Sequence, residues 1–68
     1  MNVNKTIGEN ILKLRIVDGL SQSELADRLG ISPQAVSKWE RALCCPDISH
    51  LPHIAKVFGT SIDELFKE

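Results

Sequence analysis

Four polar side chains recur at helical spacing in the middle of the sequence and could contact the edges of DNA bases. Gln34, Ser37, Lys38 and Arg41 follow the pattern i, i+3, i+4, i+7, so a helix would bring them to one side, and no acidic residue is among them. A glutamine amide can pair with adenine, a lysine suits O6 and N7 of guanine, and a serine can contact either base in a major groove wide enough for a helix. The same stripe is also typical of an ordinary solvated helix face, so spacing alone leaves both interpretations open.

The segment around this stripe has the start and stop signals of two short helices joined by a tight turn. Ser21 and Glu24 have the form of a capping box, which opens a helix that Gly30 ends. Ser32 as the N-cap and Pro33 in the first position then begin the next helix, which we expect to end near residue 41. Two helices with so short a connection must cross steeply, which predicts a helix-turn-helix.

Two further polar residues lie where such a unit would meet the DNA backbone. Gln22 opens the first of the two helices, where free backbone N–H groups and the helix dipole favour a phosphate oxygen. Arg41 lies near the end of the second helix, where we expect it to meet a phosphate. In this interpretation Gln22 and Arg41 position the protein, while Gln34, Ser37 and Lys38 contact bases.

The whole chain predicts an all-α fold of five short helices in one domain, residues 1–68. The three other helices are expected over residues 5–18, from near Ser49 to Gly59, and after a second capping box of Ser61 and Glu64. Apolar side chains at helical spacing give the expected core, which consists of Ile7, Ile11, Leu14, Leu25, Ala26, Leu29, Val36, Trp39, Leu43, Leu51, Ile54, Ala55, Phe58, Ile62 and Leu65.

Two charged residues border the buried sides of their helices. Arg15 follows Ile11 by four residues, and Glu40 follows Val36 by four residues. A charge at the edge of a core is costly alone and usually finds a partner. We therefore predict an ion pair between Arg15 and Glu40 that ties the first helix to the third, with two independent surface charges as the alternative.

Composition and charge exclude several classes of protein. Eight Lys and Arg against nine Asp and Glu give a net charge of −1, so a nucleic-acid surface must be a local patch. No apolar run approaches the roughly 18 residues of a transmembrane helix, and no signal peptide is visible. Adjacent Cys44 and Cys45 cannot form a disulfide framework; they favour a reducing, cytoplasmic setting, with one of them tucked under Trp39 or Leu51 and the other exposed.

Metal binding and catalysis have little support in the sequence. Cys44, Cys45, His50 and His53 could suggest a zinc site, but adjacent cysteines are poor partners at one tetrahedral ion, so we expect no metal. The sequence has no strand-turn-helix elbow, no glycine-rich phosphate loop and no His-Glu-x-x-His motif. We expect a binding protein rather than an enzyme, with no cofactor, no membrane association and no small-molecule ligand.

The chain resembles the lambda-repressor-like, Cro/C1-type (Xre) helix-turn-helix family from about Ile7 to Phe66. The resemblance is carried by residues 19–26 (GLSQSELA), 29–32 (LGIS), 36–41 (VSKWER), 46–48 (PDI) and 61–65 (SIDEL). It implies a five-helix domain that binds double-stranded operator DNA, usually as a dimer. By that likeness Gln22 would hold a phosphate, Pro33, Gln34, Ser37 and Lys38 would face bases, Arg41 would lie at the backbone, and Arg15 and Glu40 would match the family's ion pair.

One residue departs from the family pattern, and one is the best candidate for a subunit contact. Ala42 stands where the family commonly has glycine, so we expect the loop after the third helix to be shaped differently. Phe66, almost at the end of the sequence, is the candidate for the homodimer contact. The sequence thus predicts a sequence-specific transcriptional regulator, a repressor by preference. The alternative is a protein-interaction module, such as an antitoxin, that keeps the fold.

Overall fold

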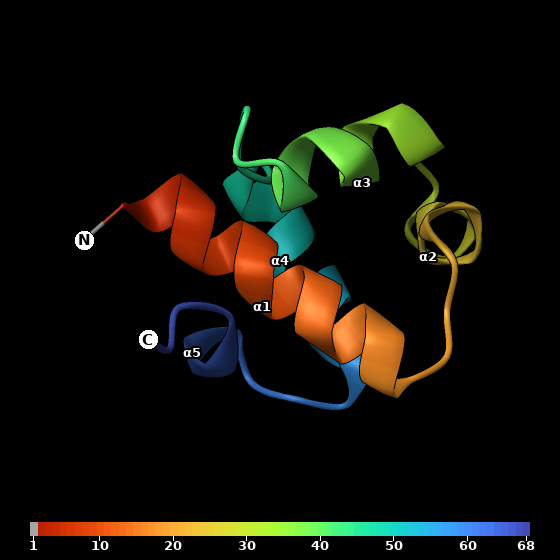
Figure 1. Cartoon of the computed structure of the whole chain (residues 1–68). Helices are drawn as coiled ribbons and strands as arrows, with labels where there is room; N and C mark the ends of the chain where they lie inside the picture. The colour runs from red at the N-terminus through yellow and green to blue at the C-terminus, as the bar shows by residue number, and fades with distance from the viewer. Residues whose placement is uncertain (1) are drawn as a thin grey trace.

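The computed structural model describes residues 2–68, and every regular element in this part of the chain is a helix. The five-helix all-α fold predicted above is confirmed. In Figure 1 the longest helix, α1, crosses the front of the molecule, with α3 above it and α4 behind it. The elements are α1 (Val3–Val17), α2 (Gln22–Leu29), α3 (Pro33–Glu40), the short 3-10 turn η1 (Ile48–His50), α4 (Leu51–Phe58) and α5 (Ile62–Leu65). The start of α1 and the C-terminal end of the chain lie on the same side of the molecule (Figure 1).

Side-chain caps explain where the first three helices begin. Asn2 accepts a hydrogen bond from the Lys5 N–H at 3.1 Å, so α1 begins at residue 3 rather than at the expected residue 5. The predicted capping box of α2 is present, because the Glu24 N–H donates to Ser21 Oγ at 3.0 Å and the Ser21 N–H donates to Glu24 Oε1 at 2.9 Å. Ser32 caps α3 as expected.

The later helices begin differently from the prediction. Residues 48–50 form η1, so α4 begins at Leu51 and not near Ser49, although Pro52 does lie in its first turn. The second capping box, expected of Ser61 and Glu64, is wrong, because Ser61 makes no side-chain cap hydrogen bond. The Glu64 N–H instead donates to the backbone carbonyl of Ser61 at 3.2 Å, so the turn itself satisfies that donor.

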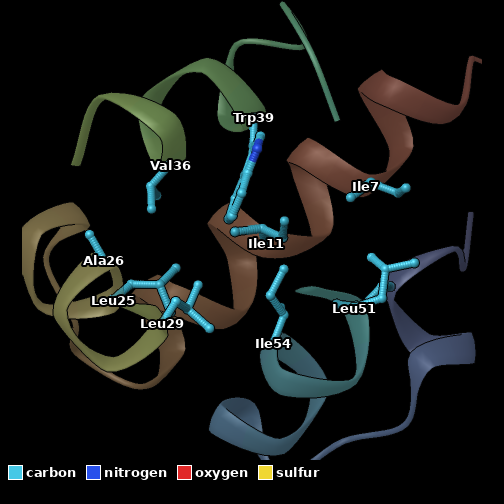
Figure 2. Packing of buried hydrophobic residues seen from close by; sticks show 10 residues of the cluster. Ile7, Ile11, Leu25, Ala26, Leu29, Val36, Trp39, Leu51 and Ile54 are labelled. Carbon is cyan, nitrogen blue, oxygen red and sulfur yellow. The ribbon is translucent and has the colours of Figure 1, made fainter. Parts of the chain in front are cut away.

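The core lies between the helices and receives side chains from all five of them. Ile11, Leu25, Val36, Ile54 and Leu65 are fully buried. Figure 2 shows the core side chains of α1, α2, α3 and α4 converging on one another. Most of the predicted core residues are therefore found where helical spacing placed them, because each helix has a single apolar face to cover.

Gly8 allows α1 and α3 to approach each other closely. The residue is buried, and a Cβ atom added to it would overlap the backbone carbonyl oxygen of Trp39. Any side chain at this position would therefore push α3 away from α1. A glycine inside a helical pattern has no spacing signal that marks a close contact, so the sequence does not predict the contact of Gly8.

The chain after α3 corrects three predictions. Ala42 has a φ angle of 60°, the left-handed backbone that usually requires glycine, and this turns the chain away from the core. Leu43, expected in the core, is consequently 62% exposed. Cys44 and Cys45 are both exposed, so the expectation that one lies under Trp39 or Leu51 is also wrong; Pro46 is the buried residue of this loop. The third wrong prediction, after those for Leu43 and the cysteines, is that Ile62 lies in the core. At the start of α5, 38% of Ile62 remains exposed.

Candidate nucleic-acid interface

The polar stripe on α3 faces away from the core. Pro33, Gln34, Lys38 and Arg41 are exposed, and Ser37 is half-buried. The opposite face of α3 is held inside by Val36, which is 0% exposed, and Trp39, which is 4% exposed. Since the buried face fixes the helix, the side chains of the stripe lie together on one open surface.

The turn between α2 and α3 is short and closed by the backbone. Gly30 has a φ angle of 71°, which ends α2, and the Ile31 N–H donates to the Ala26 carbonyl at 3.0 Å. Ser32 then begins α3 at once. The start of α2, where Gln22 lies, and the exposed face of α3 are thereby held in a fixed relation.

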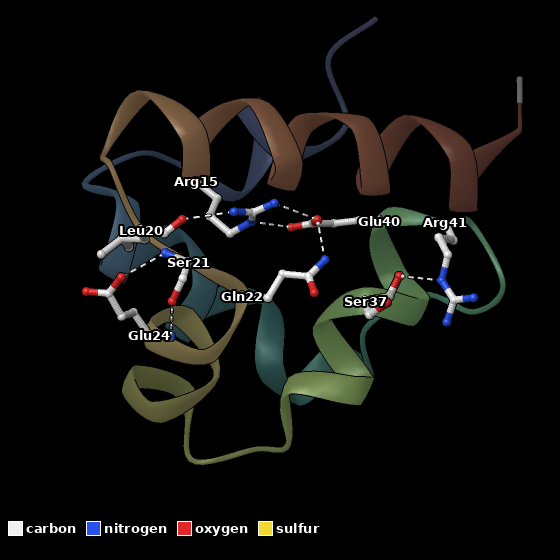
Figure 3. Close-up of polar contacts among 8 residues, drawn as sticks. All are labelled: Arg15, Leu20, Ser21, Gln22, Glu24, Ser37, Glu40 and Arg41. Atoms are coloured by element: carbon white, nitrogen blue, oxygen red, sulfur yellow. Dashed lines mark hydrogen bonds and ion pairs between the residues drawn. The ribbon is translucent and has the colours of Figure 1, made fainter.

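Arg15 and Glu40 form a two-pronged ion pair between α1 and α3 (Figure 3). Arg15 Nε donates to Glu40 Oε2 at 2.7 Å, and Nη2 donates to Oε1 at 3.0 Å. The third bond of the guanidinium goes from Nη1 to the Leu20 carbonyl at 2.9 Å. The hydrogen bond to Glu40 raises the pKa of Arg15, against the opposing effect of desolvation. The pair expected from burial is therefore present, and it also ties down the connection between α1 and α2.

Gln22 joins this ion pair through a hydrogen bond that the sequence does not predict. Its side-chain Nε2 donates to Glu40 Oε1 at 2.9 Å, as Figure 3 shows. At about 100° per residue, Glu40 lies next to Ser37 around the α3 axis. Gln22 is therefore placed beside the Ser37 edge of the stripe. No sequence signal links Gln22 to Glu40, since the two residues are 18 positions apart.

The positions of Arg41 and Phe66 fit their predicted roles less closely than those of the other candidate residues. The Arg41 side chain is exposed and folds back along α3, where its Nε donates to the Ser37 carbonyl at 3.4 Å. Phe66 is half-buried and packs against the core, so only part of its ring is open to another subunit. Ile62, at the start of α5, is more exposed than Phe66.

The remaining features of the surface lie away from this stripe. A hollow of about 350 Å³ runs along α1 to the C-terminal residues, and its lining includes Glu9, Lys13 and Lys67 but no residue of α3. Within residues 2–68, no three side chains of His, Cys, Asp or Glu gather as metal ligands would. The helices of this part of the chain are all too short or too polar to cross a membrane.

Comparison with known families and proteins agrees with this geometry. The Helix-turn-helix family matches residues 11–65. The chain is 40% identical to the HTH-type transcriptional activator BcrR of Enterococcus faecalis over 84% of its own length and 28% of that protein. It is 38% identical to the regulator YonR of Bacillus subtilis, over 88% of this chain and 56% of that one. The chain thus spans between about a quarter and just over half of these relatives.

A relative of similar length and two solved structures extend the likeness. The regulator y4dJ of Sinorhizobium fredii is 37% identical over 96% of this chain and 84% of its own length. The restriction-modification controller protein C.AhdI of Aeromonas hydrophila superimposes with a TM-score of 0.85 at 27% identity, over 93% of this chain and 96% of that one. HppE, whose crystal structure contains a substrate, gives a TM-score of 0.87 at 29% identity, but this chain covers only 36% of it.

The HppE likeness shows that the same fold also forms part of a longer protein, so fold alone does not define an activity. The family match over most of the chain, the relatives named as transcriptional regulators and the helix-turn-helix formed by α2 and α3 all agree. The chain belongs to the Cro/C1-type (Xre) helix-turn-helix family of DNA-binding transcription regulators.

Proposed function

We propose that residues 1–68 form one domain that binds a specific double-stranded DNA site, with α3 in the major groove, and that the protein represses transcription as a homodimer in the cytoplasm. The carrying observation is the open stripe of Gln34, Ser37 and Lys38 on a helix whose other face is anchored by Val36 and Trp39. A helix fixed in this way can present side chains to base edges without first becoming ordered.

The individual roles follow from the chemistry of each side chain. Gln34 has the donor and acceptor that an adenine edge requires, and Lys38 suits O6 and N7 of guanine. Ser37 and Pro33 lie beside them, where they would touch the neighbouring bases. Gln22, beside the stripe, and Arg41, at its C-terminal end, would contact phosphates, which fixes the register of the helix without reading sequence.

Repression and dimerisation are the finer parts of this proposal. A protein that occupies a site overlapping a promoter blocks transcription by its presence, so repression requires nothing of this chain beyond binding. The described residues carry about equal numbers of positive and negative charges, so one subunit can neutralise few phosphates. Two subunits on half-sites about one helical turn apart would supply the missing affinity. The exposed part of Phe66 and its neighbour Ile62 offer an apolar contact for such a pair.

The decisive experiment is selection of bound duplexes from a random DNA pool, followed by titration of the selected site with purified variants. Lys38→Ala should weaken binding by about 1–3 kcal/mol and relax the preference at one base pair. Gln22→Ala should instead weaken binding to the selected site and to random DNA alike, because it removes a phosphate contact.

Two results would contradict the proposal. One is a selection that enriches no sequence; the other is equal affinity of the unchanged protein and the Lys38→Ala variant for the selected site. Lys56→Ala is a matched control, since Lys56 is an exposed lysine on α4 and not on the stripe, and it should leave the preference intact. Sedimentation of the complex with a full site and with a half-site would test the dimer separately.

A protein-interaction module remains the second candidate, and exposed apolar residues favour it. Val17 and Ile48 are each 80% exposed, and Leu43 is 62% exposed. A salt titration separates the candidates. DNA binding must weaken as salt rises, because counterions compete for the phosphates, whereas an apolar protein interface hardly responds.

A further inference from the structure

The side chain of Gln22 is oriented by a carboxylate that is itself fixed in place. Glu40 accepts three hydrogen bonds, two from Arg15 and one from Gln22, and its side chain is only 5% exposed. Arg15 is 14% exposed and is held at its third position by the Leu20 carbonyl. The acceptor that Gln22 meets therefore has little freedom to move, in contrast to most surface partners.

The chemistry of the two groups determines which end of the Gln22 amide faces Glu40. An ionised carboxylate only accepts hydrogen bonds, so it must meet the NH₂ end of the amide and not the carbonyl oxygen. One amide hydrogen is used in the 2.9 Å bond to Glu40 Oε1. The hydrogen bonds found among residues 2–68 leave the second amide hydrogen unused, and Gln22 is half-buried at the first position of α2.

A carboxylate this close to a phosphate contact would ordinarily oppose DNA binding. Like charges a few ångströms apart repel, and the repulsion is strongest where water is excluded. Here Arg15 meets both carboxylate oxygens, so the pair has no net charge. Glu40 can therefore act as a hydrogen-bond acceptor beside the DNA surface without presenting an unbalanced negative charge.

We propose that Glu40 is a positioning residue for DNA binding: its carboxylate, neutralised by Arg15, turns the Gln22 amide so that the second amide hydrogen meets a DNA phosphate. The inference rests on the proposed function and assigns a role in it to a residue that would not touch DNA. It differs from a purely structural role, because it requires that the contribution of Gln22 to affinity depend on Glu40.

The test measures the effect of Gln22→Ala on affinity in two backgrounds, with the selected duplex as the probe. The first background is the unchanged chain, and the second is Arg15→Met with Glu40→Leu, which replaces the ion pair by apolar groups of similar size and should preserve the fold. Gln22→Ala should lower the affinity about tenfold in the first background, as for a hydrogen bond to a charged group, and less than about twofold in the second. Gln34→Ala is the control and should cost the same in both.

Each other outcome has a definite meaning. An equal loss from Gln22→Ala in both backgrounds would overturn the inference, because Gln22 would then act without Glu40. No loss in the unchanged chain would also overturn it, while a continuing effect of Lys38→Ala would leave the proposed function standing. Failure of the unchanged chain to bind any selected duplex would instead defeat the proposed function itself.

Nuclear magnetic resonance provides a second measurement, which uses only the unchanged chain and so does not depend on whether a variant folds. The two Nε2 hydrogens of Gln22 give separate signals because rotation about the amide C–N bond is slow, and the hydrogen bonded to Glu40 should be the one shifted downfield. Addition of the duplex should move the signal of the other hydrogen and leave the bonded one nearly unchanged. Movement of neither signal, or loss of the bond to Glu40 on binding, would overturn the inference.

Discussion

On one face of α3, Val36 and Trp39 are buried and the backbone of Trp39 lies against Gly8, while on the opposite face Gln34 and Lys38 extend into solvent. The contact between Gly8 and Trp39 leaves no room for an added Cβ atom, whereas Gln34 and Lys38 are exposed to solvent. Stability and placement of the helix therefore depend on the inner face, and partner choice depends on the outer one. This division allows the outer residues to change without loss of the fold.

Glu40, at the border between the two faces, should give the largest effect on stability. Glu40→Leu would leave the Arg15 guanidinium without its partner near the core, and we expect a loss of about 3 kcal/mol in the free energy of unfolding. The double variant Arg15→Leu with Glu40→Leu should recover most of that loss, because no unpaired charge remains. Chemical denaturation of the single and double variants gives the coupling energy. A coupling energy near zero would show that the ion pair does not join α1 to α3.

Gly8→Ala tests the inner face directly. The added methyl group would overlap the Trp39 carbonyl oxygen, so α1 and α3 must separate, and we expect a net loss of about 2 kcal/mol. The gain in helix propensity, up to about 1 kcal/mol, works against this loss. Glu9→Ala, at the next and exposed position, is the control and should change stability by less than about 0.5 kcal/mol. Equal unfolding curves for both variants would refute the close contact.

Ala42→Gly tests the end of α3 and should act in the opposite direction. Ala42 has a φ angle of 60°, a conformation that costs a non-glycine residue about 1–2 kcal/mol. Glycine removes this strain but gains freedom in the unfolded chain, so we expect a net stabilisation of about 0.5–1 kcal/mol. Ala35→Gly, within α3, provides the same substitution in a right-handed position and should destabilise instead. A decrease in melting temperature for Ala42→Gly would contradict the assigned strain.

The smallest expected effect is a loss of stability at low pH. It tests the capping box of α2, the helix that places Gln22 at the edge of the stripe. The Ser21 N–H bonded to its carboxylate lowers the pKa of Glu24 below the ordinary value of 4.5. The ionised form therefore contributes stability that is present above pH 4.5 and is lost as the pH falls through the lowered pKa. Glu24→Gln should flatten this acid dependence in melting curves. If the acid dependence of the melting temperature is the same in Glu24→Gln, the Glu24 carboxylate makes no pH-dependent contribution to stability.

Local signals explain why so much of α2 and α3 could be predicted. Ser21, Glu24, Ser32 and Gly30 act within a few residues of their own positions, so their spacing in the sequence is enough to set the helix ends. The sequence predictions were wrong where the backbone conformation of one residue, and not helical spacing, set the path of the chain. Ala42 turns the chain by adopting an unfavourable backbone conformation, and Leu43 left the core as a result.

The sequence by itself determined the five helices and the polar stripe on α3, because helical periodicity and capping depend on near neighbours. The same periodicity placed Arg15 and Glu40 at the edge of the core, and the cost of an unpaired charge there predicted their ion pair. Only the tertiary structure decided that Gly8 lies against Trp39 and that Gln22 joins Glu40, because these contacts unite segments far apart in the chain. The distance between two helices and the direction of one amide depend on how every other side chain fills the core, and no local pattern records that.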